Sequence, residues 1–496
     1  MAAAEHIPGV PGGRSMKSLL KGAALFVAVA CLVWIAVLWR WQATQRDMGL
    51  DDIVLYLAIL PVVVFALILA GRWAVGGALE RQQARAAAAA AGGAPAASAA
   101  AASGAGARPP LAWHLLGAWL HTAGGDSVDA LLAAIEAGSP RPRPDSALQG
   151  DDGLPVMTAR IAAAPAAGPD RPSAAPPRAI RALASLAPLV DALAQSLTIW
   201  AGQWADAAAL ATKADGFAPA VDSARIVRVI AAWPTDWDDT ACAGAQAWLL
   251  DRLCKPLADA LPPARWTVRS QRLTGSELLS AAERTLEALQ REGRDDPVVV
   301  MACHSDLDAA GIRSLAGAQR LFHAVRRPKV AMAGEGAAVM VLSALNWPAD
   351  AAIDGERVHF NSPAIVRRST SIESAGRTAT DDAVRLVDHV LAQAALTGST
   401  IAGLASDADQ HTARATELFA VTLASMPDLD PNEDLRLAGT LTGRLEAVAP
   451  LLTLALAAAQ ARASGRPAVA LSLADPHWRM AAVLRPDAFK TDPPPA

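Results

Sequence analysis

Residues 333–345, AGEGAAVMVLSAL, combine two glycines with an unbroken apolar run. Gly334 and Gly336 permit backbone conformations that other residues resist, and we expect the turn to need them either at positive φ or in close backbone approach. Residues 337–342 are typical of a strand that is buried on both faces. The stretch therefore predicts a glycine turn that leads into a buried core strand, and a turn and strand of this kind imply no chemistry by themselves.

Two other segments accompany this stretch. Residues 295–308, DDPVVVMACHSDLD, predict a second buried strand that ends in a polar turn, and residues 437–459, LAGTLTGRLEAVAPLLTLALAAA, predict a glycine loop that opens a long apolar helix. Strand and helix patterns alternate in two successive rounds over residues 111–486, which implies parallel sheets covered by helices. A generic doubly wound α/β domain would show the same periodicity.

The order and wording of the three segments resemble those of the β-ketoacyl synthases of the thiolase superfamily. The resemblance covers residues 111–486 and implies a thiolase-like α/β fold of two pseudo-repeated halves, with layered parallel or mixed sheets and helices. It also implies a homodimer. Active members carry a nucleophilic Cys at the start of a buried helix, a His in an HGTGT-like loop and a His in a KxxxGH loop. A helix N-terminus lowers the pKa of the thiol, and the two imidazoles stabilise the oxyanion and assist decarboxylation.

The resemblance places these three positions at Ser276, Ser406 and Arg444, so all three catalytic side chains are replaced. Ser276 heads a helix predicted for residues 276–291, where a serine is typical of an N-cap. Arginine stays cationic and cannot act as a neutral base. Because an unpaired buried charge is costly, we expect Arg444 to pair with Glu446 or Glu417 and to close the pocket.

Positions that the resemblance marks as structural are retained. These residues are Gly334, Glu335, Gly336, Glu417 and Gly443.

The remaining chemistry-bearing residues do not assemble into a site. Cys242, in DDTACAGAQAWLL, is similar to the DTACSS phrase of synthases but lies about twice too far from the buried strand, so we expect a small core residue. His411 lies too late in its loop to replace the missing histidine. His304, Asp306 and Asp308 share one short turn, which predicts a solvated polar turn rather than a metal site. The four cysteines show no metal-ligand spacing, and we expect neither a metal nor a cofactor.

Two long apolar runs, residues 22–39 and 53–70, predict a transmembrane hairpin, with two buried core helices as the alternative. Basic residues flank the hairpin on both outer sides, which places both chain ends in the cytoplasm. The formal net charge of −4 and the absence of a basic patch argue against a nucleic-acid binder. The predicted parts are a cytoplasmic segment (1–17), the hairpin (18–72), an Ala/Gly/Pro-rich tether (73–110), the thiolase-like domain (111–486) and a flexible tail (487–496).

Two classes of function remain open. The first is a catalytically inactive thiolase-like scaffold or accessory subunit at the bacterial inner membrane, for example in an envelope assembly such as type VI secretion, with a protein partner that the sequence does not name. The second is a divergent acyltransferase or condensing enzyme that acts at the membrane in fatty-acid or polyketide metabolism.

The predicted topology can be tested with reporters fused after Pro486. We expect a cytoplasmic reporter to be active there and alkaline phosphatase to be inactive, because basic residues retain both ends of the hairpin inside. Phosphatase activity at this position would contradict the predicted orientation.

Overall fold

The structure, a computed structural model, describes residues 111–162, 176–215, 225–324, 330–344, 357–374, 378–487 and 489. The described residues belong to one compact unit, Arg108–Ala496. The predicted transmembrane hairpin, the tether and nearly all of the tail lie outside the described residues.

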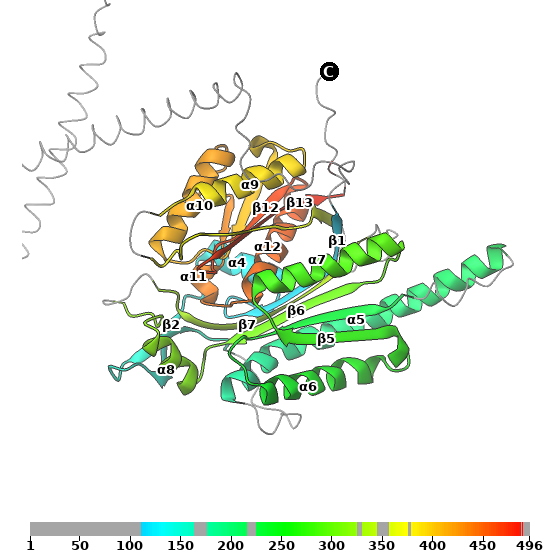
Figure 1. Cartoon of the computed structure of the whole chain (residues 1–496), viewed down its shortest axis with the longest axis horizontal. Helices are drawn as coiled ribbons and strands as arrows, with labels where there is room; N and C mark the ends of the chain where they lie inside the picture. The colour runs from blue at the N-terminus through cyan, green and yellow to red at the C-terminus, as the bar shows by residue number, and fades with distance from the viewer. Residues whose placement is uncertain are drawn as a thin grey trace, which may run out of the picture. The chain divides into compact units, whose positions relative to one another are not determined.

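In the N-terminal half, the described residues form five strands of the main sheet, a small hairpin and five α-helices, and Figure 1 shows their arrangement. The strands are β1 (Ala112–Thr122), β4 (Val227–Trp233), β5 (Trp266–Arg272), β6 (Val298–Ser305) and β7 (Ala333–Ser343), with the hairpin β2 (Arg143–Gln149) and β3 (Pro155–Ala159) beside them. The helices are α4 (Val128–Ala137), α5 (Pro177–Asp215), α6 (Asp239–Leu257), α7 (Gly275–Glu292) and α8 (Ala309–Gly317).

The C-terminal half repeats this arrangement with shorter elements. Its strands are β8 (Val358–Asn361), β9 (Ala364–Arg367), β10 (Gly403–Ser406), β11 (Leu435–Leu437), β12 (Ala468–Ser472) and β13 (Trp478–Pro486). Its helices are α9 (Asp381–Gln393), α10 (Thr412–Ser425), α11 (Gly439–Thr442) and α12 (Val448–Ser464).

The two halves have the same strand order. The N-terminal half runs β5-β4-β6-β7-β1 and the C-terminal half β11-β10-β12-β13-β8. In each half, the first three strands of this order are parallel to one another. The fourth strand is antiparallel to the third, and the fifth is antiparallel to the fourth. Strand β1 joins the halves, because it pairs with β7 on one edge and with β8 on the other. The predicted alternation of strands and helices is confirmed, and of the predicted parallel or mixed sheets the mixed form is present, since each half closes with antiparallel strands.

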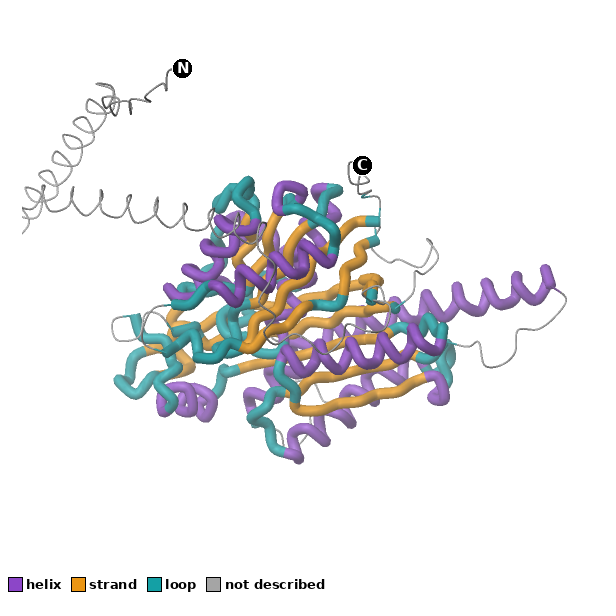
Figure 2. The backbone as a smooth tube through the Cα atoms, turned by 45° about the horizontal axis from the view of Figure 1, so that its top comes forward, coloured by secondary structure: helices purple, strands orange, loops and turns teal. Residues whose placement is uncertain are grey.

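Helices and sheet halves form five layers (Figures 1 and 2). Helices α5 and α6 cover the outer face of the N-terminal half, α9 and α10 cover that of the C-terminal half, and α7, α12 and α4 lie between the halves. Within the described residues, only the segment Pro177–Asp206 of α5 is long and apolar enough to cross a membrane, and over half of its apolar 18-residue window is buried. Its leucines pack against β6 and β7 in the outer core.

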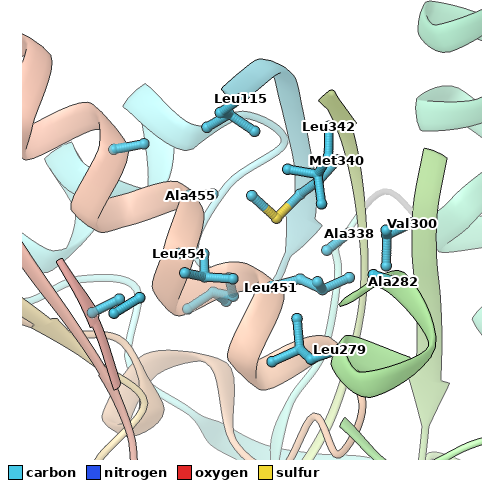
Figure 3. Close-up of a cluster of buried hydrophobic side chains, with 14 of the residues drawn as sticks. Leu115, Leu279, Ala282, Val300, Ala338, Met340, Leu342, Leu451, Leu454 and Ala455 are labelled. Atoms are coloured by element: carbon cyan, nitrogen blue, oxygen red, sulfur yellow. The ribbon is translucent and has the colours of Figure 1, made fainter. Parts of the chain in front are cut away.

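Helix α12 lies at the centre of the fold. Leu451, Leu454 and Ala455 pack against Met340 of β7 and Leu279 of α7 (Figure 3). A helix that is apolar all round is buried all round, and α12 contacts both halves of the sheet.

The predicted turn at Gly334 and Gly336 is wrong, because both glycines lie inside β7 and neither has a positive φ. The close backbone approach, which was the other expected reason for a glycine here, is present at Gly334. A Cβ atom there would lie 2.4 Å from the Thr442 carbonyl oxygen and 2.9 Å from that of Arg444. The start of β7 therefore runs directly against the loop that precedes α12.

This close approach predicts the effect of Gly334→Ala. The added methyl group must displace backbone, so we expect unfolding to become easier by roughly 1–3 kcal/mol, as for overpacked cores. Chemical denaturation measures the change. The control is Gly317→Ala, where a Cβ meets nothing within 4 Å; equal stability losses in the two variants would contradict the close approach.

Candidate functional site

A cavity of about 220 Å³ lies at the heads of the two central helices α7 and α12. The C-terminal half contributes charged side chains to its wall. Lining residues include Thr274, Gly275, Ser276, Asp409, Arg414, Gly443, Arg444, Glu446, Asp475 and Arg479. The structure thus brings two of the predicted positions, Ser276 and Arg444, to one cavity.

The head of α7 is held by a capping box. The Glu277 N–H donates to Thr274 Oγ1 at 3.4 Å, and the Thr274 N–H donates to Glu277 Oε2 at 2.8 Å. Thr274 is therefore the N-cap, and the expected cap at Ser276 is wrong by two residues. The Ser276 hydroxyl lies 3.2 Å from Thr274 Oγ1. No histidine among the described residues has a hydrogen bond with it in this structure.

Arg444 is fixed by two carboxylates. Its Nε donates to Asp306 Oδ2 at 3.1 Å, its Nη2 donates to Asp306 Oδ1, and its Nη1 donates to Glu446 Oε1 at 2.7 Å. The expected pairing with Glu446 is present, whereas pairing with Glu417 is not. Asp306 directly follows strand β6 and lies 138 residues before Arg444 in the chain, and no sequence pattern indicated that it would reach Arg444.

His304 completes this cluster. Its Nε2 lies 3.2 Å from Asp306 Oδ1 and its Nδ1 lies 3.6 Å from Glu446 Oε2. Burial lowers the pKa of His304, but the two carboxylates outweigh burial and raise it above the usual value. Burial likewise opposes ionisation of Asp306, yet Arg444 and His304 hold the pKa of that carboxyl well below its usual range.

The predicted solvated turn at His304, Asp306 and Asp308 is wrong, because all three side chains are buried. His304 and Asp306 contact each other, whereas Asp308 has different partners. Asp308 accepts from the Gly311 N–H at 2.6 Å as the N-cap of α8, and from the Arg178 N–H at 3.2 Å. Within the part of the chain that the structure describes, no group of three or more His, Cys, Asp or Glu could hold a metal ion.

The third position, Ser406, lies apart from the cavity. It is fully buried at the end of β10, and its Oγ accepts from the Ala408 N–H at 3.2 Å. His411 lies nearby in sequence, but its Nδ1 accepts from the Ala413 N–H at 3.2 Å and caps α10. Neither residue lines the cavity.

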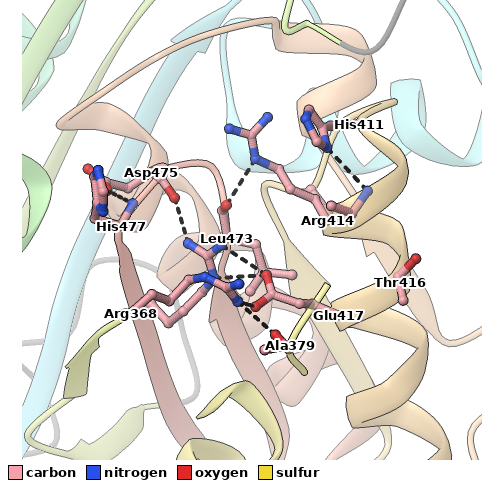
Figure 4. A network of polar contacts seen from close by, with 12 residues as sticks. Arg368, Ala379, His411, Arg414, Thr416, Glu417, Leu473, Asp475 and His477 are labelled. Atoms are coloured by element: carbon pink, nitrogen blue, oxygen red, sulfur yellow. Dashed lines mark hydrogen bonds and ion pairs between the residues drawn. The ribbon is translucent and has the colours of Figure 1, made fainter. Parts of the chain in front are cut away.

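Glu417, on α10, is fully buried between two arginines (Figure 4). Arg368 donates to its Oε1, and Arg479 donates through Nε to its Oε2 at 2.9 Å. Arg414 lies on the same helix and donates to Asp409 Oδ2 at 2.8 Å and to the Leu473 carbonyl at 3.1 Å. The resemblance marked Glu417, but the three arginines carried no recognisable sequence signal.

Glu335 and Gly443 also have defined structural roles. Glu335 is fully buried, accepts from Arg181 Nε at 2.8 Å and from the Ile161 N–H at 2.8 Å, and so ties β7 to α5. Gly443 has φ +65°, and a Cβ there would lie 2.8 Å from the Met332 carbonyl oxygen.

Cys242 lies on α6 in the outer helix layer, and burial raises the pKa of its thiol. A raised pKa removes the thiolate that a nucleophile needs.

No family model matches this chain, and no curated protein matches it. The ketosynthase from module 6 of the bacillaene synthase of Bacillus subtilis 168 is similar in structure, with a TM-score of 0.50, 13% identity, and coverage of 77% of this chain and 73% of that one. An oxazolomycin ketosynthase domain of Streptomyces albus has a TM-score of 0.49 and 11% identity, with coverage of 77% of this chain and 76% of that one. The ishigamide ketosynthase/chain length factor has a TM-score of 0.47 and 15% identity, with coverage of 75% of this chain and 99% of that one. The first likeness shows that the chain has a ketosynthase-like fold.

The ion pair of Arg444 predicts the effect of Asp306→Ala. Removing the carboxylate leaves Arg444 with Glu446 alone, and breaking a buried pair in this way costs about 3–5 kcal/mol. Thermal or chemical unfolding of the variant measures the loss. Asp428→Ala removes an exposed carboxylate and serves as the control; comparable stabilities of both variants would contradict the structural role of Asp306.

Proposed function

We propose that this chain is a ketosynthase-fold protein that binds a partner and does not condense acyl groups. The observation that carries the proposal is the head of α7, where the resemblance places the nucleophile. Thr274, Gly275 and Ser276 occupy it, and no cysteine is present.

The chemistry of the site supports this function. A serine hydroxyl is a weak nucleophile unless a neighbouring base removes its proton. The hydroxyl of Ser276 lies against Thr274 instead, and the guanidinium of Arg444 is fully engaged with Asp306 and Glu446. Losing the nucleophile and both assisting groups removes most of the roughly 8–23 kcal/mol by which an enzyme lowers its barrier.

In this proposal the apolar runs at 22–39 and 53–70 anchor the protein in the bacterial inner membrane as a two-pass hairpin. The ketosynthase-like domain then lies in the cytoplasm, forms a homodimer and acts as a scaffold or accessory subunit of an envelope assembly such as type VI secretion. The basic residues that flank the two runs, and the short segment between them, support this placement.

A divergent acyltransferase or condensing enzyme is the second candidate. One observation favours it. The cavity at the heads of α7 and α12 has a volume of about 220 Å³, and Ser276, which carries a hydroxyl group, lines it.

Acyl loading distinguishes the two functions. The purified full-length chain is incubated with acetyl-, malonyl- and long-chain acyl-CoA and with acyl-carrier protein, and its intact mass is measured. We expect no covalent adduct, because no base activates Ser276. A stoichiometric adduct that disappears in Ser276→Ala would overturn the proposal and establish the second candidate.

A further inference from the structure

Helix α10 has an exposed face that carries no charge. The exposed residues of the helix are Thr412, Thr416, Phe419, Leu423 and Ala424. The first four recur at i, i+4, i+7 and i+11, which places them on one side of a helix. Phe419 and Leu423 are 45% and 73% exposed. A single exposed apolar side chain is ordinary on a protein surface, but these two lie one turn apart. The five residues together form the α10 stripe.

The charged residues of α10 point into the domain, whereas a surface helix normally directs its charges to solvent. The helix contains two of them, Arg414 and Glu417, and both are buried. Arg414 donates to the Leu473 carbonyl at 3.1 Å, and Glu417 accepts from Arg479 Nε at 2.9 Å (Figure 4). Packing within the domain therefore accounts for the inward charges, and it leaves Phe419 in contact with water.

Carboxylates surround the C-terminal end of the α10 stripe. Asp388 of α9 lies there, because it accepts from the hydroxyl of Ser425, the last residue of α10, at 2.7 Å. Residues 426–434, MPDLDPNED, follow the helix directly and contain no lysine or arginine. The exposed carboxylates of this loop belong to Asp428, Asp430 and Glu433. The C-terminus of a helix also carries partial negative charge, so this end of the stripe favours a cation.

These charges distinguish between the occupants that an apolar helix face can take. A second copy of the chain would bring another α10 with the same acidic loop, and a lipid surface in the cytoplasm carries anionic headgroups. Each adds negative charge to a region that is already acidic, and like charges repel. A helix that has apolar residues on one side and lysine or arginine beside them is complementary both to the apolar stripe and to the carboxylates at its end.

We propose that the α10 stripe binds a basic amphipathic helix of a partner protein. The apolar residues of that helix, spaced three and four apart, pack on Phe419 and Leu423. Its basic residues lie beside Asp388 and Asp428 at the C-terminal end of α10. In recognition of this kind the apolar face supplies affinity, and the flanking charges set the orientation and speed the encounter. The inference rests on the proposed binding role and names the chemistry of the partner.

The test uses the full-length chain in phosphatidylcholine nanodiscs. The probe is a fluorescent, alanine-based helical peptide with leucines spaced three and four apart on one side and lysines beside them. We expect saturable binding by anisotropy, after subtraction of the signal from empty nanodiscs. Leu423→Lys should weaken binding at least about tenfold, because it places a cation in the apolar contact. Leu154→Lys makes the same change at an exposed leucine between β2 and β3 and should leave binding unchanged.

A second pair of variants tests the contribution of charge. Asp428→Lys should weaken binding about threefold at low salt and less at high salt, because ions screen attraction between exposed groups. Asp151→Lys changes an exposed carboxylate between β2 and β3 and should have no effect. A peptide with glutamate in place of lysine should bind far more weakly. Equal binding of the two peptides, equal binding by wild type and Leu423→Lys, or the absence of saturable binding would each overturn the inference.

Photocross-linking identifies the occupant of the stripe directly. The photoreactive residue p-benzoylphenylalanine in place of Leu423 should attach to the lysine peptide. Attachment to a second chain or to lipid in the presence of the peptide would overturn the inference, because another occupant then covers the stripe. Melting curves confirm that each variant is folded. No peptide binding together with no acyl loading removes this surface alone, whereas peptide binding together with acyl loading on Ser276 overturns the inactive pocket alone.

Discussion

Burial of helix α12 between the two halves of the sheet is the constraint on which the rest of the structure depends. The helix contacts strands of both halves, and its buried apolar residues are distributed along nearly its whole length. Its position requires the preceding loop to pass close to β7, where the Arg444 N–H donates to the Met332 carbonyl at 2.9 Å. The close approach at Gly334 and the positive φ of Gly443 are both consequences of this passage.

The same loop decides which charges meet at the cavity. It carries Arg444 and Glu446 past the end of β6, where Asp306 and His304 lie. These buried groups are expensive to remove from water, and their mutual attraction offsets that cost only in good geometry. The cavity wall is therefore built from ion pairs that already satisfy one another.

A second set of buried charges fixes the C-terminal half. Glu417 holds Arg368 and Arg479 together, and burial lowers the pKa of Arg479. Asp407 beside the cavity accepts from the Leu473 N–H at 2.6 Å and from the Ala474 N–H at 3.0 Å, while burial raises its pKa. Much of the polar character of the pocket thus belongs to the scaffold that shapes it.

The sequence by itself determined the elements and their repetition. Apolar runs such as those of β6 and β7 are stable in water only when both faces of the strand are buried, so they identify these strands with errors of a few residues at the ends. Together with the family resemblance, it placed Ser276 at the head of one helix and Arg444 in the glycine loop that precedes another. It could not show that the glycines of residues 333–336 lie within a strand, since glycine suits a turn and a close approach equally well.

Only the tertiary structure decided the partners of the charged residues. The local sequence predicts that Asp306 belongs to a solvated turn. The residue is buried instead, because the loop that carries Arg444, 138 residues later in the chain, packs against it. Glu417 likewise finds Arg368 and Arg479 from separate segments. Local sequence fixes the period of burial, whereas an ion pair depends on which distant loops the packing of α12 brings together.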